Sequence, residues 1–291
     1  MLSLVLPKGS LEHATLELFE DADLAVQRSS DVDYRATIDD PRVTDVRILR
    51  PQEIPRYVAD GRFDLGITGR DWIEETGAAV DSLAELHYSK ATARPIRVVL
   101  AVAADAPAQA VTDLPAGVRV HTEYPELTRR YFAQHGIDAD VSLSYGATEA
   151  KVPDIADAVV EITETGRALR AAGLKVIDTM LLSYTELIAN PAAHADPDKR
   201  KAMEQLQTLL TGALEARGRV LLKLNVDEAS LAAVIDLLPA LKAPTVSKLF
   251  GDDAYAVETV VAKNEINILI PELKERGATG IIELPIAKIV H

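Results

Sequence analysis

The chain has 291 residues, 48% hydrophobic and 26% charged, a composition typical of a globular protein with two or three domains. Its net charge of −14 argues against generic binding of nucleic acid or an anionic membrane, and the absence of cysteine excludes disulfides and thiolate catalysis. No run approaches about 18 apolar residues, and the polar turn at Pro7-Lys8 does not resemble a signal peptide, so we expect a cytoplasmic protein without a membrane span.

The N-terminal segment alternates short apolar runs with amphipathic ones, which predicts an α/β fold with a mainly parallel sheet. We expect Ser10 to cap the first helix. The expected elements are a strand at 2–7 followed by that helix, a strand at 45–51, a helix at 51–61 that closes at Gly61, and a strand, glycine turn and helix within 63–77.

A second α/β segment is expected to begin near Arg94. Its expected elements are strands at 94–104, 117–124 and 138–146, a helix at 125–136, a strand and helix within 157–176, and a strand at 175–184 that leads out of the segment. A long amphipathic helix follows, with Met203, Leu206 and Leu210 on one stripe.

The C-terminal segment changes pattern. Its expected order is βαββαβ, the ferredoxin-like arrangement, with strands at 219–226, 243–250, 254–262 and 278–290 and helices at 227–241 and 263–277. The two βαβ halves of this segment form the only internal repeat that the sequence indicates.

The stretch DAVVEITETGRAL, residues 157–169, carries the most informative chemistry. On a strand, Glu161 and Thr163 share one face, and Thr165-Gly166 then turns the chain into a helix. Hydroxyls, free backbone amides and Arg167 would form a phosphate cradle, with Glu161 one sugar ring away to accept hydrogen bonds from vicinal ribose hydroxyls. A phosphorylated ribose matches this combination. An ordinary capped helix with surface carboxylates explains the same residues equally well.

Other polar residues stand at the ends of predicted strands, where α/β sheets commonly bind ligands. They are Lys8-Gly9, Arg50 and Gly69-Arg70-Asp71. Tyr124 precedes Pro125 and could stack on an aromatic ligand. Each of these has a purely structural explanation when taken alone. The six histidines lack ligand spacing, which argues against a zinc site.

Four stretches occur together in one order: LPKGSL, LRPQEIPRYVADGRFDLGITGRD, DAVVEITETGRALRAAGL and LLKLNV…LPALKAPTVSKL. In order and spacing the chain resembles the ATP phosphoribosyltransferase family, in its long, histidine-regulated form. The resemblance implies transfer of the phosphoribosyl group of phosphoribosyl pyrophosphate (PRPP) to N1 of ATP with Mg²⁺, the first step of histidine biosynthesis. It also implies feedback inhibition by L-histidine and a homo-oligomer that interconverts dimers and hexamers.

The resemblance further implies a two-domain, periplasmic-binding-protein-like catalytic body and a C-terminal ferredoxin-like regulatory domain. We expect catalytic domain I to span 1–94 with a return segment at 187–217. Domain II would span 95–186 and carry the PRPP loop, and the regulatory domain would span 218–291. A non-catalytic solute-binding or amino-acid-sensing protein is the alternative. The lack of an export signal argues against the first, and the Glu161 stretch against the second.

Site residues are carried over by position. Glu161, Lys8 and Arg50 would be catalytic. PRPP would contact Glu161, Thr163, Thr165, Gly166, Arg167 and Ala168; ATP would contact Lys8, Gly9, Arg50, Gly69, Arg70, Asp71 and Tyr124; and histidine would contact Asn225, Asp227, Thr245 and Ser247. Mg²⁺ would be bound mainly through substrate phosphates. The family often has Asp at position 161 and Thr at position 168, so the chain keeps the charge at 161 but lacks one hydroxyl at 168.

Overall fold

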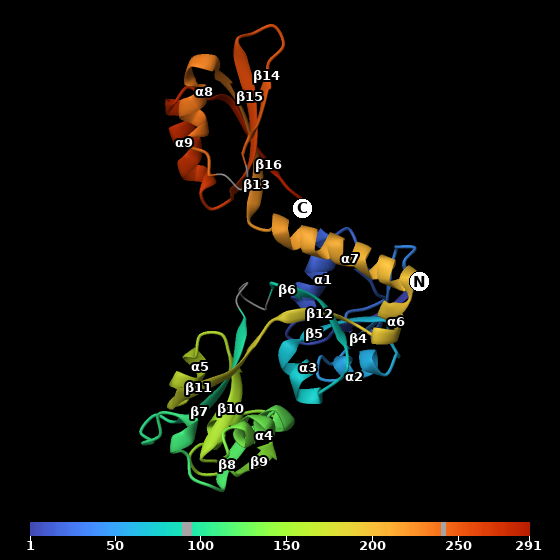
Figure 1. Cartoon of the computed structure of the whole chain (residues 1–291), viewed down its shortest axis with the longest axis vertical. Helices are drawn as coiled ribbons and strands as arrows, with labels where there is room; N and C mark the ends of the chain where they lie inside the picture. The colour runs from blue at the N-terminus through green and yellow to red at the C-terminus, as the bar shows by residue number, and fades with distance from the viewer. Residues whose placement is uncertain (89–94, 240–242) are drawn as a thin grey trace. The chain divides into compact units, whose positions relative to one another are not determined.

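The computed structural model describes residues 1–88, 95–239 and 243–291, which form two compact units (Figure 1). Unit 1 comprises Met1–Gln207 and unit 2 comprises Thr208–His291, and the boundary falls within helix α7 (Pro197–Ala216). The expected ends of one strand at Arg94 and of one helix at 240–241 lie outside the described residues. The finer boundaries expected for three domains stay a prediction.

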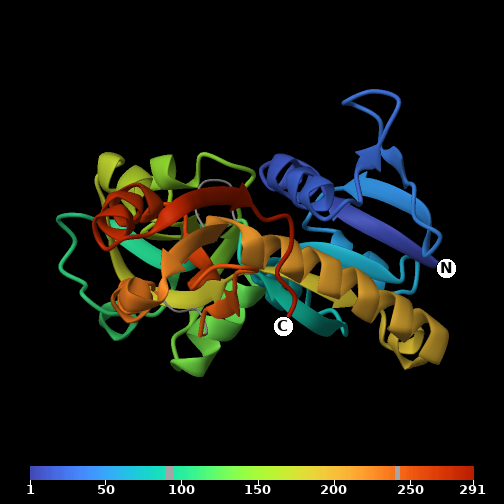
Figure 2. The ribbon, with the colours of Figure 1, turned by 90° about the horizontal axis from the view of Figure 1, so that it is seen from above.

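The first lobe of unit 1 is built on a seven-stranded sheet of order β2-β3-β4-β1-β5-β12-β6. Figure 2 shows helix α1, in dark blue, beside the strands of this sheet. Its strands are β1 (Leu2–Pro7), β2 (Val26–Gln27), β3 (Arg35–Ile38), β4 (Val43–Leu49), β5 (Leu65–Gly69), β6 (Asp81–Leu86) and β12 (Thr185–Ala189), and its helices are α1 (Glu12–Asp21), α2 (Ile54–Ala59), α3 (Arg70–Thr76) and α6 (Pro191–Ala195).

The second lobe of unit 1 is built on a five-stranded sheet of order β11-β7-β10-β8-β9. Apolar side chains cover both of its faces: α4 contributes Phe132 to one cluster and α5 contributes Leu169 to the other. The elements are β7 (Ile96–Ala103), η1 (Val111–Asp113), β8 (Val118–Thr122), α4 (Pro125–Gln134), β9 (Ala139–Leu143), η2 (Thr148–Lys151), β10 (Ala158–Thr163), α5 (Arg167–Ala171) and β11 (Leu174–Ser183).

The two sheets repeat one strand order, a relationship that the sequence did not indicate. The run β4-β1-β5-β12-β6 of the first lobe corresponds to β9-β8-β10-β7-β11 of the second. The fourth strand of each run, β12 or β7, follows directly in sequence on a strand of the other lobe. It pairs antiparallel with both of its neighbours in the sheet. The other paired strands of each run are parallel, as expected for an α/β fold, but the inserted strand makes both sheets mixed.

Two local expectations need correction. Ser10 does not cap the first helix: α1 starts at Glu12, with Leu11 as its N-cap and no side-chain cap hydrogen bond. The carboxylate of Glu12 instead accepts a hydrogen bond from the backbone amide of Gly9, at 3.2 Å. The hairpin of β2 and β3 and the strands β6 and β12 were not expected, because these strands are short and their residues were assigned to connecting chain.

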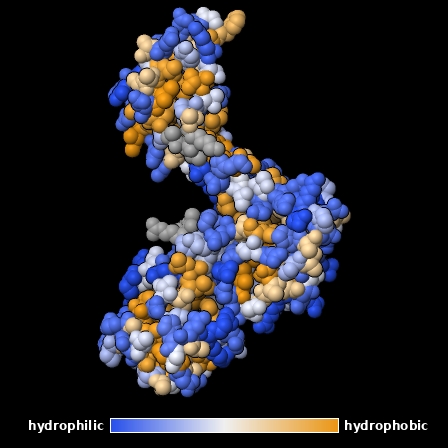
Figure 3. Space-filling view, in the orientation of Figure 1, coloured by the Kyte–Doolittle hydropathy of each residue, from blue (hydrophilic) through white to orange (hydrophobic). Residues whose placement is uncertain are grey.

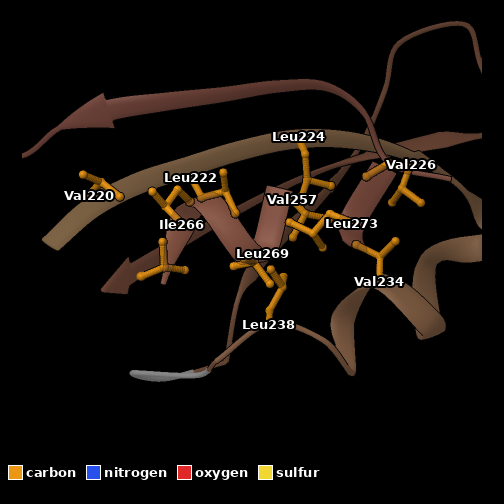
Figure 4. Packing of buried hydrophobic residues seen from close by; sticks show 12 residues of the cluster. Val220, Leu222, Leu224, Val226, Val234, Leu238, Val257, Ile266, Leu269 and Leu273 are labelled. Carbon is orange, nitrogen blue, oxygen red and sulfur yellow. The ribbon is translucent and has the colours of Figure 1, made fainter. Parts of the chain in front are cut away.

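Unit 2 has the expected βαββαβ order and a four-stranded antiparallel sheet of order β14-β15-β13-β16. Alternate residues of β13, from Val220 to Val226, point to the side of the sheet where Val234 and Leu273 of the two helices pack (Figure 4). The elements are β13 (Arg219–Asp227), α8 (Glu228–Ile235), β14 (Thr245–Lys248), β15 (Ala254–Ala262), α9 (Ile266–Glu275) and β16 (Thr279–Pro285).

Hydrophilic residues cover much of the face shown in Figure 3, with hydrophobic residues gathered in smaller groups between them. The long amphipathic stripe on α7 is buried at Met203, Leu206, Leu210 and Ala213, as its spacing predicts. Within the described residues, no helix is long and apolar enough to cross a membrane.

Candidate active site

The phosphate-type loop lies where β10 ends on the second sheet. Gly166 has φ of 72°, a left-handed conformation that residues with a side chain rarely adopt, and its amide donates a hydrogen bond to Thr163 Oγ1 at 2.7 Å. This bond holds the turn, and Leu169 then packs against Val159 and Val99 beneath it. The chain after β10 therefore folds back over the sheet face that carries Glu161 and Thr163.

Glu161 is set in an acidic, partly buried environment. Burial raises the pKa of its carboxyl group, and the nearby carboxylates of Glu123 and Glu149 raise it further, while hydrogen bonds to the carboxylate act in the opposite direction. One of these bonds comes from the backbone amide of Ile162, at 3.0 Å. The carboxylate is thus desolvated and keeps acceptor capacity for a ligand.

A cavity of about 400 Å³ adjoins the loop, and residues of both lobes form its wall. Ile162, Thr163 and Glu164 belong to the second lobe, while Gly69 and Asp71 belong to the first. The remaining wall residues include Ser10, Leu11, Pro51, Gln52, Trp72, Tyr88, Ile96, Glu123, Tyr124, Ser183, Tyr184 and Thr185. A cavity of this size and mixed lining suits a small organic ligand beside the loop.

Aromatic rings form much of the cavity wall. Trp72 and Tyr124 stack with ring centroids 4.5 Å apart and planes tilted by 34°. Tyr88 and Tyr184 line the same cavity, and the imidazole ring of His87 packs edge-on against Tyr184, with centroids 5.1 Å apart. This lining offers flat faces to a heterocyclic ring. Trp72, the single tryptophan of the chain, was not expected here, although its place directly after Asp71 was a usable signal.

Asp71 connects the two lobes at the cavity wall. Its carboxylate accepts hydrogen bonds from Tyr124 Oη and from Ser183 Oγ, both at 2.7 Å, and its backbone amide donates to Ser183 Oγ at 3.0 Å. Only 2% of the residue is exposed, and burial raises the pKa of its carboxyl group despite these donors. Burial, together with Asp71, also raises the pKa of Tyr124. Both residues thus support the cavity as well as lining it.

Six of the seven expected nucleotide-binding residues divide into two groups. Gly69, Asp71 and Tyr124 line the cavity. The pair Lys8-Gly9 precedes the wall residue Ser10, and Arg50 precedes the wall residue Pro51, but none of the three lines the cavity. Lys8 Nζ lies 4.3 Å from the centroid of the Tyr34 ring.

Arg70 is engaged by acidic neighbours in this structure. Its guanidinium donates to Glu74 at 2.9 and 2.6 Å and lies 3.6 Å from the buried Glu186. A phosphate at this position would have to compete with these carboxylates for the guanidinium.

Of the expected PRPP-loop residues, Gly166 is buried and Thr163 is half-buried, whereas Thr165, Arg167 and Ala168 are exposed. Two basic side chains that the sequence did not indicate also reach the loop, Arg97 from β7 and Arg170 from α5. Arg97 has no sequence signal, because only the pairing of β7 with β10 brings it there.

The expected histidine-site residues lie on the sheet of unit 2. Asn225 and Ser247 both pair with Ala256 of β15, and Thr245 pairs with Glu258, so these side chains occupy the sheet face opposite the helices. Asp227 ends β13 and is the N-cap residue of α8.

The resemblance noted in the sequence implies a magnesium ion. Among the described residues, no group of three or more His, Asp or Glu side chains is arranged to hold a metal. Mg²⁺ characteristically uses one or two carboxylates together with substrate phosphates and water. Glu161 beside the loop, close enough to Glu123 and Glu149 for their charges to raise its pKa, would supply one such carboxylate, with the ion held mainly by substrate phosphates.

The matching strand orders, the cavity shared by the two lobes and the separate βαββαβ unit define a periplasmic-binding-protein-like α/β body with a ferredoxin-like C-terminal domain. The family model described as ATP phosphoribosyltransferase matches residues 50–212, and the model described as HisG, C-terminal domain, matches residues 216–288. The chain belongs to the ATP phosphoribosyltransferase family.

Individual relatives agree with this assignment. The chain is 48% identical to the ATP phosphoribosyltransferase of Solibacter usitatus over 290 residues, covering 100% of this chain and 99% of that protein. It is 47% identical to the enzyme of Chlorobium phaeovibrioides over 292 residues, covering 100% and 98%. An ATP phosphoribosyl transferase (HisG:HisZ) complex from Thermotoga maritima shares the fold, with a TM-score of 0.61, 24% identity, and coverage of 72% of this chain and 99% of that one.

Proposed function

We propose that the cavity and the adjoining loop of unit 1 form an active site that transfers the phosphoribosyl group of PRPP to N1 of ATP, releasing pyrophosphate. Membership of the family supports a transferase that performs the first step of histidine biosynthesis. The observation that carries the site assignment is the position of Thr163, which belongs both to the cavity wall and to the hydrogen-bonded turn at Gly166. A sugar phosphate on the loop would therefore point its ring toward the cavity.

Each substrate has a suitable region. The aromatic wall formed by Trp72, Tyr124 and Tyr184 would hold the adenine ring. The loop at Thr165–Ala168 would hold the 5′-phosphate of PRPP through hydroxyl and backbone donors. Glu161 would accept hydrogen bonds from the two ribose hydroxyls, since its carboxylate is partly buried and faces the same side as the loop.

The protein's contribution to the reaction is positioning and electrostatics. The attack of N1 on the anomeric carbon needs no covalent enzyme intermediate, and bringing two polyanions together is the main difficulty. Lys8 and Arg50, beside the wall segments Ser10–Leu11 and Pro51–Gln52, would offset this repulsion. When bound, Mg²⁺ would neutralise charge on the departing pyrophosphate. Glu161 would stabilise the sugar as positive charge develops on it.

We further propose that unit 2 binds L-histidine as a feedback inhibitor and that the chain forms homo-oligomers, dimers and hexamers. The match of residues 216–288 to the family's C-terminal domain supports a role separate from the chemistry. The pocket residues Asn225, Asp227, Thr245 and Ser247 and the cytoplasmic location stay predictions.

The direct test is to mix the protein with ATP, PRPP and Mg²⁺ and follow the absorbance change that accompanies formation of phosphoribosyl-ATP. Turnover that requires all three components, and that histidine slows, supports the proposal. A folded protein that binds these ligands without turnover would instead be a non-catalytic binding or sensing protein.

A further inference from the structure

Two arginines converge on Gly166 from different elements. A Cβ carbon placed on Gly166 would lie 2.9 Å from Nη1 of Arg170 and 4.0 Å from Nη2 of Arg97. Arg170 belongs to α5, and Arg97 belongs to β7, where it pairs with Thr163 of β10. The two guanidinium groups therefore flank one point of the loop.

The strand register explains why Arg97 reaches this point. Val99 and Ala101 of β7 contact Leu169 of α5 and Val159 of β10 in one apolar cluster. Arg97 is two residues before Val99, so its side chain lies on the same face, at the end of that cluster. The rigid sheet supplies Arg97, and the helix above the sheet supplies Arg170.

Arg97 and Arg170 have no acidic partner among the residues that the structure describes. Within the residues that the structure describes, neither guanidinium takes part in an ion pair or a side-chain hydrogen bond. Two other arginines of the lobe are ion-paired: Arg119 with Asp157 at 2.7 Å, and Arg129 with Glu126 at 2.5 Å. In a chain of net charge −14, two adjacent unpaired guanidiniums are unexpected, because like charges at short range repel.

We propose that Arg97 and Arg170 clamp the terminal 5′-phosphate of the phosphoribosyl substrate from two sides of the Gly166 turn. The planar guanidinium is suited to bidentate contact with phosphate oxygens, and a dianion between the two groups would remove their repulsion. The proposal rests on the proposed function in taking PRPP as the ligand. It also gives Gly166 a second role: any side chain there would occupy the space of the Arg170 guanidinium.

The test distinguishes binding of the 5′-phosphate of PRPP from binding of its pyrophosphate group. Binding of PRPP, ribose 5-phosphate, pyrophosphate and ATP is measured by calorimetry for the full-length wild type, Arg97→Gln, Arg170→Gln and the control Arg119→Gln. Arg119 lies on the same sheet but pairs with Asp157, at the opposite end of β10. We expect Arg97→Gln and Arg170→Gln each to weaken ribose 5-phosphate and PRPP by a similar factor, about ten- to a hundredfold. Pyrophosphate and ATP should bind as in the wild type, and Arg119→Gln should change nothing.

The possible failures are distinguishable. If both variants bind ribose 5-phosphate like the wild type, or lose pyrophosphate instead, the clamp is wrong while the proposed function stands. If the wild type binds neither PRPP nor ribose 5-phosphate, the proposed function fails. Arg97 is half-buried, so Arg97→Gln could fail to fold, which thermal unfolding would reveal. The binding measurements on Arg170→Gln, at an exposed position, then test the clamp by themselves.

Discussion

Tyr124 donates its phenolic hydrogen to Asp71 across 2.7 Å and so joins the first turn of α3 to the segment that follows β8. Both residues are almost completely buried, and each comes from a different lobe of unit 1. The bond therefore fixes the relation of the two sheets at the wall of the cavity.

Tyr124→Phe should lower the free energy of unfolding by about 1–3 kcal/mol, because a buried carboxylate loses a donor that water does not replace. Urea denaturation measures this. The matched control is Tyr57→Phe, which removes a surface hydrogen bond to Glu53 of 3.1 Å and should change stability by less than about 0.5 kcal/mol. Equal effects of the two substitutions would contradict a special role for the buried pair.

The raised pKa of Asp71 predicts a specific pH dependence of stability. The folded protein binds this proton more tightly than the unfolded chain, whose Asp pKa is about 3.9. Between that value and the raised folded pKa, the contribution of Asp71 to the free energy of unfolding falls as pH rises, and above the folded pKa it stays low. The difference between wild type and Asp71→Asn in urea denaturation should follow this curve. A difference independent of pH would show that the folded pKa is not raised.

Glu161→Ala should reduce kcat/KM for PRPP by roughly two to four orders of magnitude, since two charge-assisted hydrogen bonds contribute about 1.5–3 kcal/mol each. ATP affinity should change far less. Because the ionised carboxylate is the acceptor and its pKa is raised, wild-type kcat/KM should fall with decreasing pH already above pH 4.5, and Glu161→Gln should flatten this fall. The exposed Glu126→Ala is the control. Near-normal kinetics of folded Glu161→Ala would mean that the segment is an ordinary capped helix.

Gly166→Ala should weaken PRPP binding in addition to lowering the stability of the fold. Both Gly166 and Gly173 have left-handed φ, 72° and 77°, so alanine at either should cost about 1–2 kcal/mol of stability. Only at Gly166 would the added carbon meet a guanidinium, whereas Gly173 has no neighbouring atom within 4 Å of that position. PRPP affinity by calorimetry should therefore fall for Gly166→Ala and not for Gly173→Ala.

Ala168→Thr should leave PRPP affinity unchanged or raise it slightly, because it adds a hydroxyl at an exposed loop position.

Ser247→Trp should relieve inhibition by histidine while activity without histidine is largely kept. Ser247 is exposed on β14, so a large ring should be tolerated by the fold and should fill the expected pocket. Turnover at increasing histidine, with histidine binding by calorimetry, checks this. If histidine neither binds the wild type nor slows it, unit 2 is better described as an assembly module.

Much of the fold could be predicted because its strands carry a strong local pattern. The apolar run at 2–7, the glycine turn at Gly69 and the alternation in β13 all correspond to observed elements. The hairpin of β2 and β3 could not be predicted, since β2 has only two residues and the alternation in β3 extends over only four. Arg97 beside Gly166 is a product of sheet register, which local sequence does not encode.

The late position of β12 in the chain has a consequence for biogenesis. A nascent chain that has emerged only as far as β6 lacks the strand that separates β5 from β6, so the first sheet stays open until residues 185–189 leave the ribosome. The second sheet must meanwhile assemble around β7, a strand that precedes the rest of its lobe in the chain. The first lobe therefore cannot be excised as a continuous fragment with its hydrogen-bond ladders intact, whereas the five strands of the second lobe all lie within 96–183 and can pair before β12 is made.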